Sequence, residues 1–203
     1  MPVSPKIDIA IQRKSITLFT ICPFHIVSKI GIAKYFIETA EKIRTLLAPH
    51  RIPLIINDRV DVVQAAGADG VHVGQNDMPP ETARRLLGPA AIIGLSVETW
   101  EDVVAAQALD VNYLGISPVY ATPTKTDTKK PWGLEGVGRI KNFSRHPLVA
   151  IGGLDASNAA DVVRAGADCI AVVSAICAAP DPFAATKQLR ETIAKAHQEQ
   201  GVA

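Results

Sequence analysis

Short apolar runs alternate with longer amphipathic stretches from residue 52 to the end of the chain. Six of the runs are apolar through their length rather than at every second position: IPLIIN (52–57), GVHVG (70–74), AIIGLS (91–96), YLGISPV (113–119), PLVAIGG (147–153) and CIAVVS (169–174). Uninterrupted apolar runs are typical of strands in a parallel sheet that is covered on both faces. The pattern therefore predicts six parallel strands, and SITLFTI (15–21) predicts a seventh before them.

The stretches between these runs carry helix signals. RVDVVQAAG (59–67) and SNAADVVRAG (157–166) both end in glycine, the residue preferred just after a helix, and PPETARRLLG (79–88) opens with prolines, which suit a first helical turn. IAKYFIETAEKIRTLL (32–47) has apolar residues at helical spacing, and PFAATKQLRETIAKAHQEQ (182–200) predicts a final helix. Strands that alternate with helices indicate βαβ units.

An internal repeat favours a closed barrel over an open sheet. AAGADGVHV (65–73) recurs as RAGADCIAV (164–172), with LDVNYLGI (109–116) as a weaker third copy, and repeated βα units are how a barrel is built. Polar or glycine clusters also follow strand after strand, whereas an open sheet concentrates them at one switch point. We therefore predict an α/β fold of the TIM (β/α)8 type as a single domain over residues 1–203, with a first βα unit that is short or missing.

Composition narrows the possible functions. The net charge is +1, which gives no basic field for nucleic acid, and no apolar run approaches the roughly 18 residues of a membrane span. The first residues lack the apolar core of a signal peptide, and the three cysteines, Cys22, Cys169 and Cys177, form no CxxC pair. We expect a cytoplasmic protein that acts on small molecules and has no nucleic-acid or membrane partner.

Two aspartates lie at the ends of consecutive strands. Asn57 and Asp58 end one strand, and Asp77 follows the end of the next. Adjacent parallel strands would bring the two carboxylates together, and two carboxylates plus substrate phosphates are a usual arrangement for Mg²⁺. The alternative is that each aspartate caps the helix that follows it. The pair at matched strand ends favours the metal.

Three later segments suit phosphate. The loop ATPTKTDT (121–128) offers the hydroxyls of Thr122 and Thr124 and the charge of Lys125, although such a loop can also be merely solvated. Gly153 and Ser174 follow the last two strands, where barrels commonly bind phosphate through glycine turns and helix N-termini. The alternatives there are a tight turn and a helix cap.

Other reactive side chains in the chain suggest no role. His72 is a single histidine in an apolar strand, and such a residue is more often a hydrogen-bonded core residue than a catalytic one. The cysteines have no neighbouring base that would indicate a nucleophile.

The order and spacing of these segments resemble the thiamine phosphate synthase family. The resemblance is carried by PLIINDRVDVVQAAGADGVHVGQNDMPP, IIGLSVET, YLGISPVYATPTKTDT, VAIGGLDASNA and AGADCIAVVSAI, and it covers roughly residues 34–195. FIETAEKIRTLL and the strand after it are similar to the fungal branch of that family.

The resemblance implies an activity and a set of site residues. The family joins a hydroxymethylpyrimidine pyrophosphate to a hydroxyethylthiazole phosphate and releases pyrophosphate. It implies Asp58 and Asp77 as Mg²⁺ ligands and Asn57, Ser96 and Lys125 as contacts of the pyrimidine pyrophosphate, with Lys125 and Ser96 the catalytic candidates. The implied thiazole phosphate pocket consists of Thr122, Pro123, Thr124, Gly153, Val173 and Ser174.

One departure from the family leaves alternatives open. The family's Gln-x-Arg-x-Lys motif, whose cations grip the pyrophosphate, is missing before the 32–47 helix, so residues 1–31 look atypical. There are therefore two alternative functions: a thiazole tautomerase-like enzyme and a non-catalytic binder of thiazole phosphate. The retained Asp58 and Asp77 argue against the tautomerase. An incomplete barrel would also expose the apolar 15–21 segment, so we expect homo-oligomers.

Overall fold

The structure, a computed structural model, describes residues 33–122 and 130–200. Along the chain it contains α1 (Ala33–Leu47), the 3-10 helix η1 (Ala48–His50), β1 (Ile55–Asn57), α2 (Val60–Ala66), β2 (Gly70–Val73), α3 (Pro80–Leu87), β3 (Ile92–Val97), α4 (Trp100–Ala106), β4 (Tyr113–Ile116), α5 (Gly133–Phe143), β5 (Leu148–Ile151), α6 (Ala159–Arg164), β6 (Cys169–Ala171), α7 (Ser174–Cys177) and α8 (Pro182–Gln200). Among these helices there is none long and apolar enough to cross a membrane.

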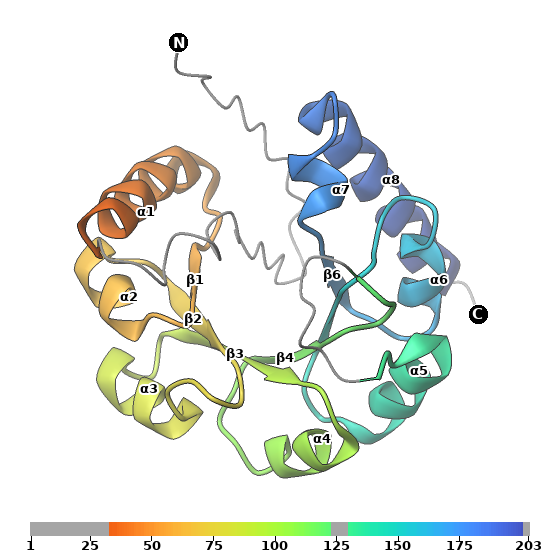
Figure 1. The fold of residues 1–203 in the computed structure, drawn as a ribbon, viewed down its shortest axis with the longest axis horizontal. Helices are drawn as coiled ribbons and strands as arrows, with labels where there is room; N and C mark the ends of the chain where they lie inside the picture. Colours follow the sequence, from red (N-terminus) through yellow and green to blue (C-terminus); the bar gives the residue numbers. More distant parts are fainter. Residues whose placement is uncertain (1–32, 123–129, 201–203) are drawn as a thin grey trace.

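The six strands form one parallel sheet in chain order, β1 to β6. Figure 1 shows the helices on the outer side of the curved sheet, with the ring of described helices interrupted between α1 and α7–α8. The six predicted strands are confirmed; five are shorter than their apolar runs, and β3 is as long as its run but shifted by one residue, to Ile92–Val97. The described residues form a half-barrel related to the TIM barrel rather than a closed barrel of eight strands; the predicted strand 15–21 lies outside them.

Two separate apolar clusters explain why the strand sequences do not alternate. Residues on the outer face of the sheet, such as Ile56, Val71 and Ile93, belong to the large core that includes the helices. Residues on the inner face form a second, smaller core, made by Ile55, Tyr113, Val149 and Ala171. Because both faces are buried, both sets of positions are apolar, as expected for a sheet of this kind.

The internal repeat has a structural role at the start of the strands. Asp69, Asn112 and Asp168 occupy equivalent positions just before β2, β4 and β6. Each accepts a hydrogen bond from a backbone N–H near the start of the neighbouring strand, from Leu54 at 2.7 Å, Ile93 at 2.8 Å and Leu148 at 2.8 Å respectively. The repeated short polar side chain thus aligns each strand with its neighbour.

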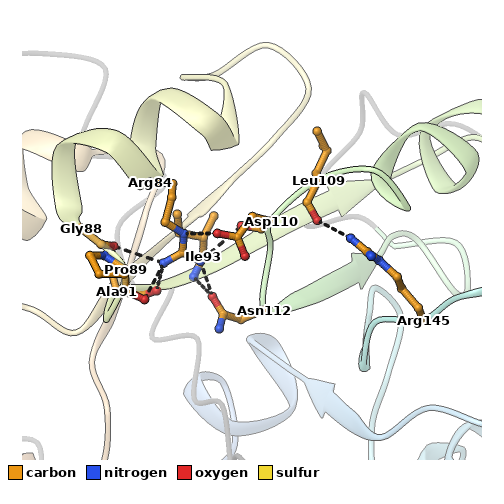
Figure 2. A network of polar contacts seen from close by, with 9 residues as sticks. All are labelled: Arg84, Gly88, Pro89, Ala91, Ile93, Leu109, Asp110, Asn112 and Arg145. Carbon is orange, nitrogen blue, oxygen red and sulfur yellow. Dashed lines mark hydrogen bonds and ion pairs between the residues drawn. The ribbon is translucent and has the colours of Figure 1, made fainter.

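Arg84 of α3 joins several loops at the amino-terminal end of the sheet (Figure 2). Its Nη1 donates to the carbonyl of Ala91 at 2.6 Å and, over longer distances, to those of Gly88 and Pro89. Its Nη2 donates to Asn112 Oδ1 at 3.0 Å and to the Asp110 carbonyl at 3.2 Å, and its Nε lies 3.0 Å from the Asp110 carboxylate. One guanidinium therefore holds the β3 and β4 entry loops against α3.

His146 is a buried histidine at the same end of the molecule. The buried ring lies just before β5, with Nε2 3.1 Å from the Ala106 carbonyl at the end of α4. Burial lowers the pKa of His146 below its ordinary value of 6.5. Between the lowered pKa and 6.5 the unfolded chain binds more protons than the folded chain, so the folded state loses stability as the pH falls through this range.

We expect the free energy of unfolding to decrease when the pH is lowered from 7.5 to below about 6.5, and part of this decrease to disappear in His146→Gln. Urea denaturation at a series of pH values measures it. His197→Gln, which changes an exposed histidine on α8, is the matched control and should leave the pH dependence unchanged. Equal pH dependence of the wild type and His146→Gln would contradict the prediction.

Candidate functional site

The predicted site residues gather at the carboxyl ends of the strands. Asn57 ends β1 and Asp58 follows it, and Ser96 is the second-to-last residue of β3. Thr122 comes after β4, Gly153 after β5, and Val173 and Ser174 two and three residues after the end of β6. Because the six strands are parallel, their carboxyl ends share one edge of the sheet. Pro123, Thr124 and Lys125 lie outside the described residues, so their predicted roles stay predictions.

Neither aspartate of the predicted metal pair caps a helix. The N-cap of α2 is Arg59 and that of α3 is Pro79, both without a side-chain capping bond. The capping alternative for Asp58 and Asp77 is therefore wrong. The capping alternative for Ser174 is wrong as well, since Ser174 is the first residue of α7 and Val173 is its N-cap.

The two aspartates are instead held by the backbone around β2. Asp58 has a left-handed backbone conformation, with a φ of 63°, and its N–H donates to the His72 carbonyl at 2.8 Å. One carboxylate oxygen of Asp77 accepts from the Gly74 N–H at 2.7 Å. A non-glycine residue in this conformation is uncommon and is often found where function requires it. Both residues thus belong to the carboxyl end of the same strand pair, β1 and β2.

This arrangement fits Mg²⁺ bound together with a substrate. Within the described residues, there is no group of three or more histidine, cysteine, aspartate or glutamate side chains that could hold a metal ion alone. Mg²⁺ usually takes one or two carboxylates and completes its octahedron with phosphate oxygens and water. A carboxylate has two oxygens, so Asp77 can keep its bond to Gly74 and still offer the second oxygen to a cation.

A polar cluster lies on the inner face of the half-barrel, beneath this edge. His72 Nε2 lies 2.8 Å from Ser96 Oγ, and His72 Nδ1 lies 2.9 Å from the Tyr113 hydroxyl. The prediction that His72 is hydrogen-bonded is confirmed, but the residue is only partly buried and its partner Ser96 is a predicted site residue. Sequence reasoning therefore missed His72 and Tyr113 as parts of the site.

Two glycines are the sequence signal for this cluster. A Cβ at Gly94 would collide with the Tyr113 ring, and one at Gly115 would lie 2.8 Å from His72 Cε1. Strand register places Asn57, His72, Gly94 and Tyr113 side by side on four neighbouring strands. Glycine in a strand interior often marks such a close approach.

Gln75 connects the loop after β2, which carries Asp77, to Ser96. Its side-chain N–H donates to the Ser96 carbonyl at 2.7 Å. Ser96 is therefore held through its backbone by the loop that carries Asp77, and through its hydroxyl by His72. No feature of the sequence by itself pointed to this contact.

The Gly152–Gly153 turn lies against the loop that leads to Thr122. Gly153 has a φ of 67°, and a Cβ there would lie 2.8 Å from Tyr120 Cβ and 2.9 Å from the Ala121 carbonyl. The Asn158 side chain donates to the Gly153 carbonyl at 2.9 Å and holds the turn in place. Only glycine suits this conformation in so narrow a space. The loop after β4 is thereby held against the turn after β5, the two places where the sequence predicts phosphate-binding residues.

The fold and the site define a class of protein: a parallel βα half-barrel with polar residues at the carboxyl ends of its strands. Known proteins of this class are similar to this chain. The family model described as thiamine monophosphate synthase matches residues 25–176. A thiamine-phosphate synthase of Albidiferax ferrireducens is 58% identical over 158 residues, which cover 78% of this chain and 72% of that protein. One of Leptospira biflexa is 53% identical over 166 residues, 80% and 79% of the two chains.

Solved structures give the same result. The structure of thiamine phosphate pyrophosphorylase from Pyrococcus furiosus matches with a TM-score of 0.76 and 36% identity, covering 83% of this chain and 80% of that one. A 3-hexulose-6-phosphate synthase matches at 22% identity and a TM-score of 0.57, which shows a shared fold alone. The chain belongs to the thiamine monophosphate synthase family.

The comparisons correct two expectations about the branch and the N-terminus. The similarity to the fungal branch is not supported, since these relatives are bacterial, at 58% and 53% identity. The family match begins at residue 25, so residues 1–31 are not atypical as a block. α1 is an amphipathic helix in which Ala40 and Leu47 are buried, and such a pattern is common to many surface helices, so likeness there is a poor guide to the branch.

Proposed function

We propose that this chain is a thiamine-phosphate synthase, which joins a hydroxymethylpyrimidine pyrophosphate to a hydroxyethylthiazole phosphate and releases pyrophosphate. The observation that carries the proposal is that polar residues meet at the carboxyl edge of β1, β2 and β3. Asn57 and Asp58 lie at the end of β1, Asp77 lies in the loop after β2, and Ser96 lies near the end of β3. This edge offers both carboxylates for a metal and polar groups for a phosphorylated substrate. The named relatives are thiamine-phosphate synthases.

The pyrimidine half of the site has to promote the loss of pyrophosphate. The C–O bond between the pyrimidine methylene and the pyrophosphate breaks, and its electron pair leaves with the pyrophosphate oxygen. Asp58 and Asp77 would hold Mg²⁺, which supplies positive charge next to the leaving oxygens. Asn57 and Ser96 bind the pyrimidine pyrophosphate, and Lys125 stabilises the negative charge that develops on it.

The thiazole half positions the nucleophile. Thr122, Pro123, Thr124, Gly153, Val173 and Ser174 hold the phosphate of the thiazole substrate. The thiazole nitrogen then donates its lone pair to the pyrimidine methylene, and a C–N bond forms. This nitrogen carries no proton, so the reaction needs no protein base.

An assay of both substrates with Mg²⁺ tests the proposal, with thiamine phosphate as the product measured. A folded preparation that forms no product would contradict it. Calorimetry with each substrate alone then separates the alternatives: a non-catalytic binder takes up the thiazole phosphate only. A thiazole tautomerase-like enzyme would convert the thiazole substrate without the pyrimidine pyrophosphate or Mg²⁺.

Three further expectations remain predictions. We propose that residues 1–203 form a single domain, that the protein acts in the cytoplasm, and that it forms homo-oligomers. Gel filtration coupled to light scattering measures the last of these.

A further inference from the structure

We propose that Tyr113 and His72 are positioning residues, which fix the Ser96 hydroxyl so that its proton points to the leaving pyrophosphate. The inference rests on the proposed function for the identity of the substrate. It concerns the buried Tyr113 and the partly buried His72 below the site edge, whose contacts lead to Ser96 and from there to the mouth of the half-barrel.

The geometry of the three side chains is that of a continuous hydrogen-bonded chain. The Tyr113 hydroxyl lies 2.9 Å from His72 Nδ1, and His72 Nε2 lies 2.8 Å from Ser96 Oγ. The Tyr113 and His72 rings are stacked, with their centroids 5.4 Å apart. Tyr113 is 1% exposed, so its hydroxyl is fixed by the interior and not by solvent.

Two inward-facing positions of the half-barrel, Gly94 and Gly115, carry no side chain, which leaves space for this series of hydrogen bonds. A Cβ at Gly94 would lie 2.5 Å from His72 Nδ1, and one at Gly115 would lie 2.8 Å from His72 Cε1. The inner face elsewhere carries Ile55 and Val149, which form its apolar core. A Cβ at Gly94 would also collide with the Tyr113 ring, so the two glycines leave the space that the Tyr113 and His72 rings occupy.

A neutral imidazole fixes which group donates and which accepts in this series of hydrogen bonds. One ring nitrogen donates and the other accepts, and the neighbouring groups decide which. With the Tyr113 hydroxyl donating to Nδ1, the proton lies on Nε2, which donates to Ser96 Oγ. The Ser96 hydroxyl then has its own proton to donate to another acceptor. Gln75 holds the Ser96 carbonyl at 2.7 Å, so both ends of this residue are fixed.

A double-mutant cycle tests the proposal through the turnover number and the KM for the pyrimidine pyrophosphate. We expect Tyr113→Phe to lower kcat by about tenfold, the size of one lost hydrogen bond, with a smaller change in KM. In a Ser96→Ala background Tyr113→Phe should have no further effect on kcat. Tyr35→Phe, which removes an exposed hydroxyl on α1, is the control and should leave kcat unchanged.

If Tyr113→Phe lowered kcat by the same factor in the wild-type and the Ser96→Ala backgrounds, the proposal would be overturned, because Tyr113 would then act independently of Ser96. A second measurement does not depend on activity. In chain labelled with ¹⁵N-histidine, the His72 signal, assigned by its loss in His72→Gln, should report the Nε2–H tautomer in the wild type and a mixture in Tyr113→Phe. An Nδ1–H tautomer in the wild type would overturn the proposal, whereas a wild-type chain that forms no thiamine phosphate would overturn only the proposed function.

Discussion

Asp77→Asn should lower the rate of thiamine phosphate formation by about a hundredfold or more, while the fold is retained. The amide oxygen of asparagine can still accept the hydrogen bond that Gly74 N–H donates to Asp77 Oδ2 at 2.7 Å, so the loop keeps its shape. The substitution removes the negative charge that would bind Mg²⁺. Loss of a single electrostatic contact to a developing charge costs about 3 kcal/mol in the barrier, which is roughly a hundredfold in rate.

The measurement is kcat at saturating Mg²⁺, together with calorimetry of the pyrimidine pyrophosphate with and without Mg²⁺. Asp161→Asn is the matched control, since Asp161 lies on α6 and pairs with Arg164 at the surface, away from the strand ends. Its turnover should equal that of the wild type. Wild-type turnover and metal-dependent binding in Asp77→Asn would show that this aspartate is not a metal ligand.

Arg84→Met should lower the free energy of unfolding by about 3 kcal/mol. The side chain is only 15% exposed and bonds to the carbonyls of three loop residues, to Asn112 and to Asp110. Methionine keeps part of the aliphatic volume but leaves several partly buried acceptors unpaired, and such losses cost about 1 to 3 kcal/mol each before relaxation and access of water. For a protein of this size we expect the melting temperature to fall by about 6 to 12 °C.

Arg85→Met provides the control on the neighbouring residue. Arg85 is exposed and donates one long hydrogen bond to Thr82 Oγ1, at 3.3 Å, so we expect a change within about 0.5 kcal/mol. Urea denaturation of both variants measures the difference. Equal stability of the two variants would mean that the Arg84 contacts contribute nothing net to folding.

The strands could be predicted from sequence because their burial is unusual. Both faces of the sheet are covered, by the helices on one side and by Ile55, Tyr113, Val149 and Ala171 on the other, so each strand is a continuous apolar run. Five of the six runs overestimated the strand length; before β1, for example, Ile52 and Leu54 are buried but lie outside the strand. Apolar character reports burial, whereas a strand ends where its backbone pairing ends.

The site edge was predictable for a related reason. In a parallel sheet every strand ends at the same side, so Asn57, Asp58, Ser96 and Gly153 could be assigned to one edge before any contact was known. The family's motifs added the roles. The capping alternatives were wrong because α2 begins two residues after Asp58, at Val60, and α3 begins three residues after Asp77, at Pro80.

The sequence by itself determined the six parallel strands, the helices between them and the edge that carries the polar residues, because these depend on local patterns of burial and on chain order. Only the tertiary structure decided which side chains meet. His72 joins Ser96 and Tyr113, which lie 24 and 41 residues further along the chain, and Arg84 joins Asn112, which lies 28 residues further along. Such contacts depend on strand register and on the space that Gly94 and Gly115 leave, and neither is visible in a local pattern.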